Sequence, residues 1–176
     1  THAAMTLLRG RAEDLALAPW LQDAIAPIER RWVDPEYVRD GTELAIAEML
    51  RGGITCCSDM YFHPEASARA FESTGMRALV GAPILDFPTP YAADADAYLQ
   101  RGLSARDAFK HVPHLAFALA PHAPYTVGDD TFAKIVMYAH QLDLPIETHV
   151  AETRDEVDAA LRDTGSTTLA RLDRLG

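Results

Sequence analysis

Side chains that could bind a metal ion or transfer protons stand at the ends of several short apolar runs of this sequence. They are His2, Asp59, His122, His149 and Glu152. A neutral imidazole offers a ring nitrogen to a divalent metal, and a carboxylate three residues further on can stay off the metal and handle protons. His149 and Glu152 therefore suit a metal ligand and its general base. A buried histidine beside a helix cap, with the carboxylate bound to an arginine or to water, explains the same two residues equally well.

The apolar runs that end at these residues are typical of buried parallel strands. Each run is short, rich in apolar residues and bounded by Gly, Pro or polar residues. The runs span residues 54–60, 77–85, 115–120 and 145–150, and the stub of a further strand ends at His2. Apolar residues at helical spacing lie between the runs, most clearly from Phe132 to Leu142. This alternation of strands and helices predicts an α/β fold with a parallel sheet.

Two of the predicted helices carry clear signals at their ends. Asp34-Pro35-Glu36 supplies an N-cap, a proline in the first turn and an acidic residue, and Gly52-Gly53 ends the same helix. Thr153 and Glu156 form a capping box, and Gly165 would end the helix that they begin. The second helix therefore starts directly after the histidine and carboxylate considered above.

The number of strands favours one half of a closed barrel. Four strands and a stub make about half of an eight-stranded (β/α)8 TIM barrel, which typically needs roughly 250 residues. We expect residues 1–176 to be the N-terminal half to two-thirds of a metal-dependent hydrolase barrel, with parts missing upstream of Thr1 and downstream. In a parallel barrel the carboxyl ends of the strands share one face, so the residues that follow them would converge on one cavity. Composition alone leaves an open, doubly wound sheet as an alternative.

Composition and charge exclude several classes of protein. The chain is 48% hydrophobic, with 16 basic and 26 acidic side chains and a net charge of -10. The apolar content excludes a disordered chain, and no apolar run reaches the about 20 residues of a membrane span. Acidity without basic clusters argues against nucleic acid and favours a small neutral or cationic substrate. Adjacent Cys56 and Cys57 predict buried free thiols in a reducing compartment, and because there is no signal peptide we expect the cytoplasm.

Several motifs, taken in order, resemble one family along essentially the whole chain. They are Thr1-His2-Ala3-Ala4-Met5-Thr6-Leu7-Leu8-Arg9-Gly10, Trp20-Leu21, Asp59-Met60-Tyr61, Gly75-Met76-Arg77-Ala78, Pro121-His122-Ala123-Pro124-Tyr125 and His149-x-x-Glu152-Thr153. Together they resemble the amidohydrolase superfamily, in its branch of nucleoside deaminases and chlorohydrolases, and within that branch the 5′-methylthioadenosine/S-adenosylhomocysteine deaminases. The resemblance implies a TIM barrel that holds one zinc ion per subunit.

The resemblance implies metal and proton-transfer roles for three residues. His2 matches the second member of a His-x-His zinc-binding pair, and His149 matches the third zinc-binding histidine. Glu152 matches the carboxylate that shuttles protons, which makes it the implied catalytic residue. The first histidine of the pair would precede Thr1, and a further histidine and a zinc-binding aspartate would follow Gly176. The ligand set is therefore incomplete in this segment, and we expect the chain alone to be inactive.

The resemblance also implies a set of substrate contacts, to which Glu152 belongs. Trp20 matches an aromatic wall of the pocket, Glu29 a carboxylate that accepts hydrogen bonds from ribose hydroxyls, and His122 a substrate-contacting histidine. The implied reaction is zinc-dependent hydrolytic deamination of an adenosine-type nucleoside, with release of ammonia. Some relatives bind the polar tail of the substrate with an arginine where this chain has Gly81-Ala82-Pro83. This departure favours 5′-methylthioadenosine over S-adenosylhomocysteine as the substrate.

Two alternatives to this function stay open. A hydrolase of another amino- or chloro-substituted ring, of the guanine or triazine type, would use the same metal and the same Glu152. A non-catalytic binding protein that kept the barrel would also retain these motifs. The expected partner is a small molecule, with neither nucleic acid nor membrane, and a homo-oligomer is compatible with the resemblance.

Overall fold

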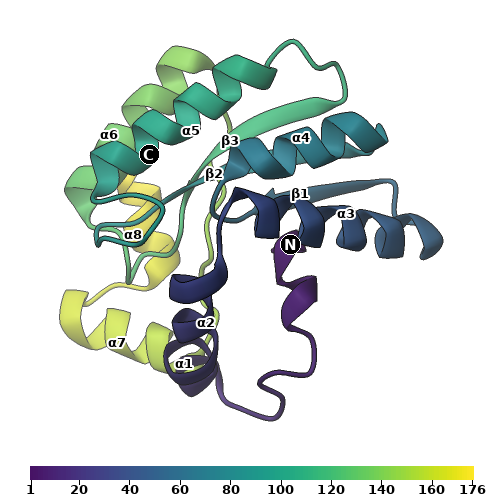
Figure 1. The fold of residues 1–176 in the computed structure, drawn as a ribbon. Coiled ribbons are helices and arrows are strands. Elements are labelled where there is room, and N and C mark those ends of the chain that lie inside the picture. The colour runs from purple at the N-terminus through teal and green to yellow at the C-terminus, as the bar shows by residue number, and fades with distance from the viewer.

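The computed structural model describes residues 1–176 and has at its centre a parallel sheet of three strands in the order β1, β2, β3 (Figure 1). β1 spans Cys56–Met60, β2 spans Arg77–Ile84 and β3 spans Leu115–Pro121. The strands pair in parallel register, with Cys56 of β1 opposite Arg77 of β2. The predictions of strands at 54–60, 77–85 and 115–120 are therefore confirmed.

A short N-terminal segment extends the sheet on the β1 side. The Thr1 carbonyl accepts the Met60 N–H at 3.0 Å, and the Thr1 backbone nitrogen donates to the Ser58 carbonyl at 2.6 Å. These two bonds make the pattern of a parallel pair. The stub that we predicted to end at His2 therefore lies beside β1.

The run predicted as a strand at 145–150 lies beside β3 but does not form a regular strand. The Leu119 N–H donates to the Pro145 carbonyl at 3.0 Å, and the Glu147 N–H donates to the Leu119 carbonyl at 3.1 Å. Only one isolated parallel bridge results, between Leu119 and Ile146. The next bond of a parallel ladder needs an N–H at position 121, and Pro121 has none. The prediction of a strand at 145–150 is wrong for this reason, although the segment keeps its place at the edge of the sheet.

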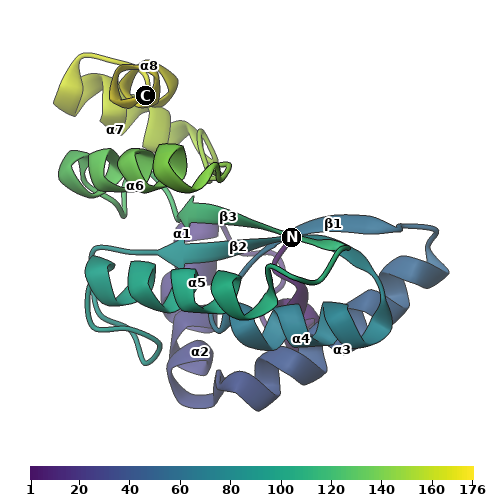
Figure 2. The ribbon, with the colours of Figure 1, turned by 90° about the horizontal axis from the view of Figure 1, so that it is seen from above.

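Helices connect the strands and cover one face of the sheet. Figure 2 shows α3, α4 and α5 along that face, and α6, α7 and α8 beyond β3. The helices are η1 (a 3₁₀ helix, Ala3–Leu8), α1 (Leu17–Pro19), η2 (a π-helical segment, Trp20–Ile25), α2 (Ala26–Trp32), α3 (Pro35–Arg51), α4 (Pro64–Thr74), α5 (Ala95–Phe109), α6 (Asp129–Leu142), α7 (Arg154–Thr164) and α8 (Thr168–Leu175). None of them combines the length and the apolar character that a membrane crossing requires.

The two helices with clear sequence signals begin and end as predicted. At the start of α3, the Asp34 side chain accepts the Tyr37 N–H at 2.8 Å, and Pro35 is the first helical residue. At the start of α7, Thr153 Oγ1 accepts the Glu156 N–H at 3.1 Å. Gly165 ends α7 with a φ of +67°, a left-handed conformation that glycine adopts without strain.

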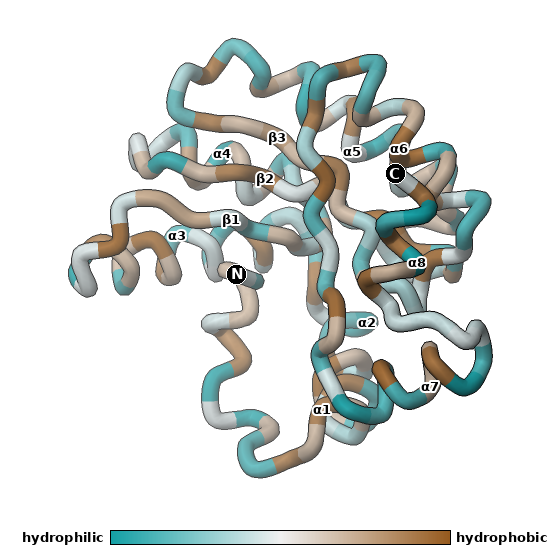
Figure 3. Tube along the Cα trace, turned by 180° about the vertical axis from the view of Figure 1, so that it is seen from behind, coloured by the Kyte–Doolittle hydropathy of each residue, from teal (hydrophilic) through white to brown (hydrophobic).

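The hydrophobic core lies between the sheet and its helices, in two main clusters of buried residues. One joins β2 and β3 to α4 and α5 and includes Phe71, Val80 and Phe117. The other joins the carboxyl ends of β2 and β3 to α5 and α6 and includes Leu119 and Ile135. Figure 3 shows apolar residues running along β2 and β3. This packing holds the strand ends rigidly, and with them the side chains that follow the strands.

The two cysteines differ from the sequence-based expectation in their burial. Both thiols are free, as predicted, but Cys56 is exposed and Cys57 is partly exposed. The prediction that both are buried is wrong because the N-terminal segment pairs with β1 only near Ser58 and Met60, which leaves the start of the strand uncovered. Burial still raises the pKa of the Cys57 thiol to about 11.

Candidate active site

The segment that carries His2 is anchored to the protein by two buried contacts. The Ala3 N–H donates to Asp59 Oδ1 at 2.7 Å, and Asp59 is only 1% exposed. The helix η1 also packs tightly on α3, since a Cβ placed on Gly41 would lie 2.5 Å from the Ala4 carbonyl oxygen. Burial raises the pKa of Asp59 to about 6, against the opposing hydrogen bond from Ala3. These contacts fix the backbone on the carboxyl side of His2.

The imidazole of His2 is oriented by the last residue of β1. His2 Nδ1 is hydrogen-bonded to the carbonyl of Met60. Because a carbonyl oxygen only accepts, Nδ1 must carry the proton, and Nε2 keeps its lone pair. A backbone carbonyl that holds the second ring nitrogen in this way is a common feature of metal-binding histidines.

His2 and His149 face each other through their Nε2 atoms, which are 3.1 Å apart. Their ring planes are inclined by 75°, with the ring centroids 5.0 Å apart. Two nitrogens bound to one tetrahedral zinc ion at about 2.0–2.1 Å each would lie roughly 3.3–3.4 Å from one another. The spacing and the free Nε2 of His2 therefore fit two ligands of a single zinc ion.

The surroundings of His2 favour the neutral ring that a metal requires. Burial lowers the pKa of His2 below its ordinary value, and the nearby His149 lowers it as well, although the Met60 carbonyl acts in the opposite direction. Metal binding needs a deprotonated ring nitrogen, so the lowered pKa of His2 favours metal binding. No group of three or more His, Cys, Asp or Glu side chains in residues 1–176 could hold a metal on its own. The two imidazoles thus fit part of a zinc site.

His122, which follows β3, joins the same group of imidazoles. Its ring centroid lies 5.2 Å from that of His149, with the planes inclined by 79°. His122 Nδ1 lies 2.9 Å from Thr126 Oγ1, and this hydroxyl donates its own proton to the Ala123 carbonyl at 3.0 Å. Nδ1 is therefore the donor, and Nε2 is the free nitrogen. Burial lowers the pKa of His122 to about 4, and the neighbouring histidines add to this effect.

Glu152 lies beside His149, just before α7. Its Oε1 atom is 4.0 Å from His149 Nδ1, and its Oε2 atom accepts a hydrogen bond of 2.7 Å from the Tyr125 hydroxyl. The backbone here is held by Glu156, whose carboxylate accepts the N–H groups of Ala151 and Glu152 at 3.1 and 2.8 Å. The carboxylate is thus placed next to the histidine pair, where it could exchange protons with a ligand of the metal.

Glu29, on α2, is connected to the histidines through Tyr61. The Tyr61 hydroxyl donates to Glu29 Oε1 at 2.7 Å, and the Tyr61 ring centroid lies 6.2 Å from that of His2. Burial raises the pKa of Glu29, whereas the hydrogen bond from Tyr61 lowers it. Glu29 Oε2 has no partner within the protein and can accept hydrogen bonds from a ligand.

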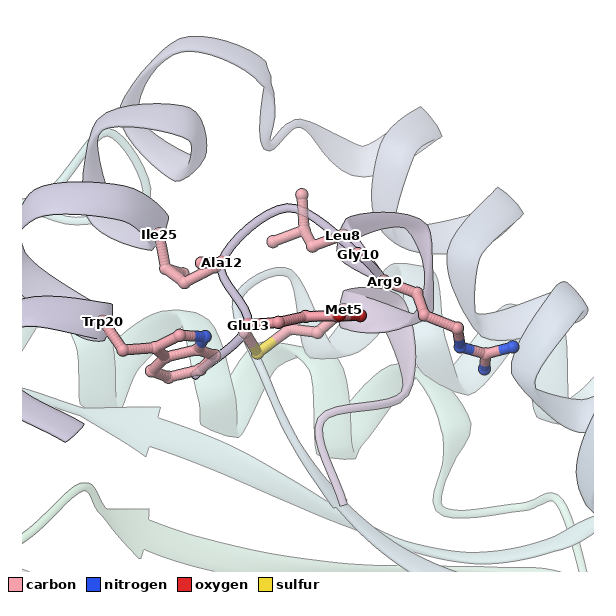
Figure 4. A pocket seen from close by; sticks show the side chains of 8 residues that line it. All are labelled: Met5, Leu8, Arg9, Gly10, Ala12, Glu13, Trp20 and Ile25. Atoms are coloured by element: carbon pink, nitrogen blue, oxygen red, sulfur yellow. The ribbon is translucent and has the colours of Figure 1, made fainter. Parts of the chain in front are cut away.

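Trp20 lies at a different place, in an apolar pocket of about 320 Å³ beside η1 (Figure 4). Met5, Leu8 and Ile25 line this pocket with it, and Arg9 and Glu13 also contribute to its wall. None of the histidines and neither Glu29 nor Glu152 lines it, so the structure does not bring Trp20 into the histidine group. Its interpretation as a wall of the substrate pocket stays a prediction.

Sequence reasoning missed the residues that orient the candidate site. Tyr61 and Tyr125 end two of the motifs described above, but their hydrogen bonds to Glu29 and Glu152 join residues 32 and 27 positions apart. The same holds for the Met60 carbonyl, since no sequence pattern marks a main-chain acceptor. The only available signal was that each of these residues follows or ends a predicted strand.

Comparisons with known proteins show which family this chain belongs to. A sequence model of the amidohydrolase family matches residues 1–176. A 5-methylthioadenosine/S-adenosylhomocysteine deaminase of Saccharophagus degradans is 47% identical over 175 residues, which are 99% of this chain and 39% of that protein. A deaminase of the same name from Aquifex aeolicus is 42% identical over 176 residues, 100% of this chain and 41% of that protein. The chain thus spans about two fifths of the length of these relatives.

Solved structures show the same fold. An adenosine deaminase of Xanthomonas campestris, determined with bound zinc, has 50% sequence identity and a TM-score of 0.96, and the match covers 99% of this chain and 40% of that chain. The guanine deaminase of C. acetobutylicum is 18% identical, with a TM-score of 0.87 over 100% of this chain and 44% of its own, and shows the fold alone. These matches confirm the partial TIM barrel and exclude the open, doubly wound sheet. With a family model that matches the whole chain and relatives at 42–47% identity, the chain belongs to the amidohydrolase family.

Proposed function

We propose that residues 1–176 are the N-terminal part of a longer barrel enzyme, called the intact enzyme below, that deaminates adenosine-type nucleosides by hydrolysis. The observation that carries this proposal is the approach of His2 Nε2 and His149 Nε2 to 3.1 Å, with the Glu152 carboxylate beside them. The names of the relatives give 5-methylthioadenosine and S-adenosylhomocysteine as candidate substrates. The reaction consumes one water and yields ammonia and an inosine-type product.

His2 and His149 would hold zinc through their Nε2 atoms, together with ligands from the rest of the intact enzyme. Zinc bound there would lower the pKa of a water molecule toward about 7 and so supply a nucleophile at neutral pH. Glu152 would accept the proton of that water at Oε1, the oxygen nearer to His149. It would then deliver that proton to the purine ring nitrogen while the water oxygen bonds to the carbon that carries the amine. The second proton of the water would pass to the amine, so that the C–N bond breaks and ammonia leaves. General acid–base catalysis of this kind contributes about 10²–10⁴-fold to the rate.

Two further residues would hold the nucleoside in place. His122 would contact the substrate through Nε2, because Nδ1 is engaged by Thr126. Glu29 would accept hydrogen bonds from the ribose hydroxyls at Oε2, because Oε1 is engaged by Tyr61. A carboxylate in this role has no obvious partner on a free purine base, so it selects nucleosides.

The chain favours a neutral substituent at the 5′ position over a charged homocysteine tail. Gly81 brings no cation to the sheet, and the Glu147 carboxylate fills the space that a Cβ would occupy there. The segment Gly81-Ala82-Pro83 therefore offers no cation to bind the carboxylate of the homocysteine tail. We expect 5′-methylthioadenosine to be the better of the two substrates.

We also propose the cytoplasm as the location of the enzyme, with the nucleoside as its small-molecule partner. The free thiols of Cys56 and Cys57 support this, because exposed free cysteines persist in reducing compartments.

The decisive experiment measures ammonia release and zinc content of the intact enzyme. We expect turnover of 5′-methylthioadenosine, slower turnover of S-adenosylhomocysteine and no turnover of adenine. The Glu152→Gln variant should keep its zinc and lose about 10²–10⁴-fold in kcat. Equal activity on adenine and the nucleoside would favour a hydrolase of free heterocycles. A well-folded protein without zinc would favour a non-catalytic barrel.

A further inference from the structure

We propose that Tyr61 is a positioning residue that holds the Glu29 carboxylate at a fixed position relative to His2. It thereby gives the site its preference for nucleosides with free ribose hydroxyls. This inference rests on the proposed function, because it concerns the same substrate. It assigns a role to a side chain that the proposed reaction does not otherwise use.

The first argument is the rigidity of Tyr61 itself. Tyr61 directly follows β1 and is 6% exposed. It packs in a buried cluster with Ala4, Val38 and Ala66, and its ring lies 5.5 Å from that of Phe62. A phenol ring confined in this way points its hydroxyl group in one fixed direction, which is toward Glu29 Oε1 at 2.7 Å.

The second argument is that Glu29 has no other anchor. It lies on α2, a helix of seven residues, and it forms no ion pair in the protein. The hydrogen bond from Tyr61 is the only one that its carboxylate makes. Burial favours the protonated acid and so raises the pKa of Glu29, while the Tyr61 hydroxyl opposes this shift and favours the acceptor form. Without the Tyr61 hydroxyl, the Glu29 side chain would lose its fixed orientation. Its carboxyl group would also be protonated more readily and would accept hydrogen bonds less well.

The third argument is the position of Tyr61 next to a metal-binding candidate. Met60 holds His2 Nδ1 through its carbonyl, and the next residue, Tyr61, holds Glu29 through its hydroxyl. Two consecutive residues at the end of one strand therefore fix a metal ligand and a sugar-binding carboxylate. The distance between the reacting carbon and the ribose of a bound nucleoside must match this spacing, so a small shift of Glu29 should weaken binding of the sugar without disturbing the metal.

The test compares two nucleosides that differ only in the groups that Glu29 would bind. Binding of adenosine and of 2′,3′-dideoxyadenosine is measured by calorimetry on the intact enzyme in a Glu152→Gln background, in which turnover is slow. Tyr61→Phe should weaken adenosine binding about tenfold, as expected for the loss of one hydrogen bond to a charged group. It should change dideoxyadenosine binding less than about twofold, because that ligand offers Glu29 no hydroxyl. Zinc content should not change.

A matched control separates this effect from a general loss of packing. Tyr98, on α5, is also buried and also uses its hydroxyl in a hydrogen bond, to Thr89 Oγ1. Tyr98→Phe should leave the binding of both nucleosides unchanged. Adding Tyr61→Phe to Glu29→Gln should have no further effect on adenosine binding if the two residues act together.

Each outcome decides the proposal. If Tyr61→Phe weakens the binding of both nucleosides equally, or weakens the binding of neither, the positioning role is overturned. If the unsubstituted enzyme releases no ammonia from any adenosine-type nucleoside, the proposed function fails, and the pair of binding constants still decides whether Tyr61 acts on a sugar-binding Glu29.

Discussion

The buried carboxyl group of Asp59 should make the stability of the intact enzyme depend on pH, and the isosteric substitution Asp59→Asn should remove this dependence. Asp59 is 1% exposed, its Oδ2 atom has no hydrogen-bond partner, and burial raises its pKa from 3.8 to about 6. Because the pKa is higher in the folded state, the folded chain binds the proton more tightly. The free energy of unfolding therefore falls as the pH rises through this window.

The size of the effect follows from the two pKa values. A shift from 3.8 to about 6 lowers the free energy of unfolding by about 3 kcal/mol once both forms are ionised. Of this loss, about 1 kcal/mol falls between about pH 5 and pH 8, since the unfolded chain has already released most of the proton at pH 5.

Urea denaturation at pH 5 and pH 8, for the original sequence and for Asp59→Asn, measures this difference. The substituted amide keeps an oxygen for the Ala3 N–H, so the anchor of η1 is retained. The original enzyme should lose about 1 kcal/mol more than the variant between the two pH values, because all other titrating groups cancel in the comparison. An equal pH dependence of both proteins would refute the argument that Asp59 is buried and carries an elevated pKa.

Three further outcomes follow from the contacts of the site. Gly41→Ala should lower the free energy of unfolding by about 1–3 kcal/mol in urea, because the new Cβ meets the Ala4 carbonyl at 2.5 Å. Tyr125→Phe should reduce kcat about two- to tenfold with unchanged zinc content, because it removes one partly exposed hydrogen bond to Glu152. Removal of the metal with a chelator should abolish turnover and lower the melting temperature, and added zinc should restore both; activity that survives chelation would contradict a zinc mechanism.

Much of the sheet could be predicted from the sequence because its signals are local. Apolar runs bounded by turn residues gave β1, β2 and β3, and helix caps at Asp34 and Thr153 gave the starts of α3 and α7. The prediction failed where the outcome depended on the neighbouring strand. The run at 145–150 has a strand-like composition, but its ladder breaks at Pro121, a residue of its partner.

The grouping of the candidate site residues could also be predicted from the sequence, but their hydrogen bonds could not. His2, His149, His122 and Glu152 end or follow strand-like runs, and the rule that such ends share one face brought them together correctly. Which atoms they use could not be predicted, because this depends on hydrogen bonds between residues distant in sequence. Trp20 lines a separate pocket with residues of η1 and of the loop that follows it, and no local pattern in the sequence marks that neighbourhood.

The same hydrogen bonds show that the fold selects the tautomer of one candidate metal ligand, His2, and of one candidate substrate contact, His122. His2 gives its Nδ1 proton to a main-chain carbonyl at the end of β1. His122 gives its Nδ1 proton to Thr126, whose own proton is already committed to the carbonyl of Ala123. Both rings therefore keep Nε2 as the free nitrogen, and burial lowers the pKa of both so that they stay neutral at neutral pH. A metal that binds to His2 thus meets a nitrogen that is already deprotonated and oriented by the end of β1. The segment that follows β3 orients the free nitrogen of His122 toward a substrate in the same way.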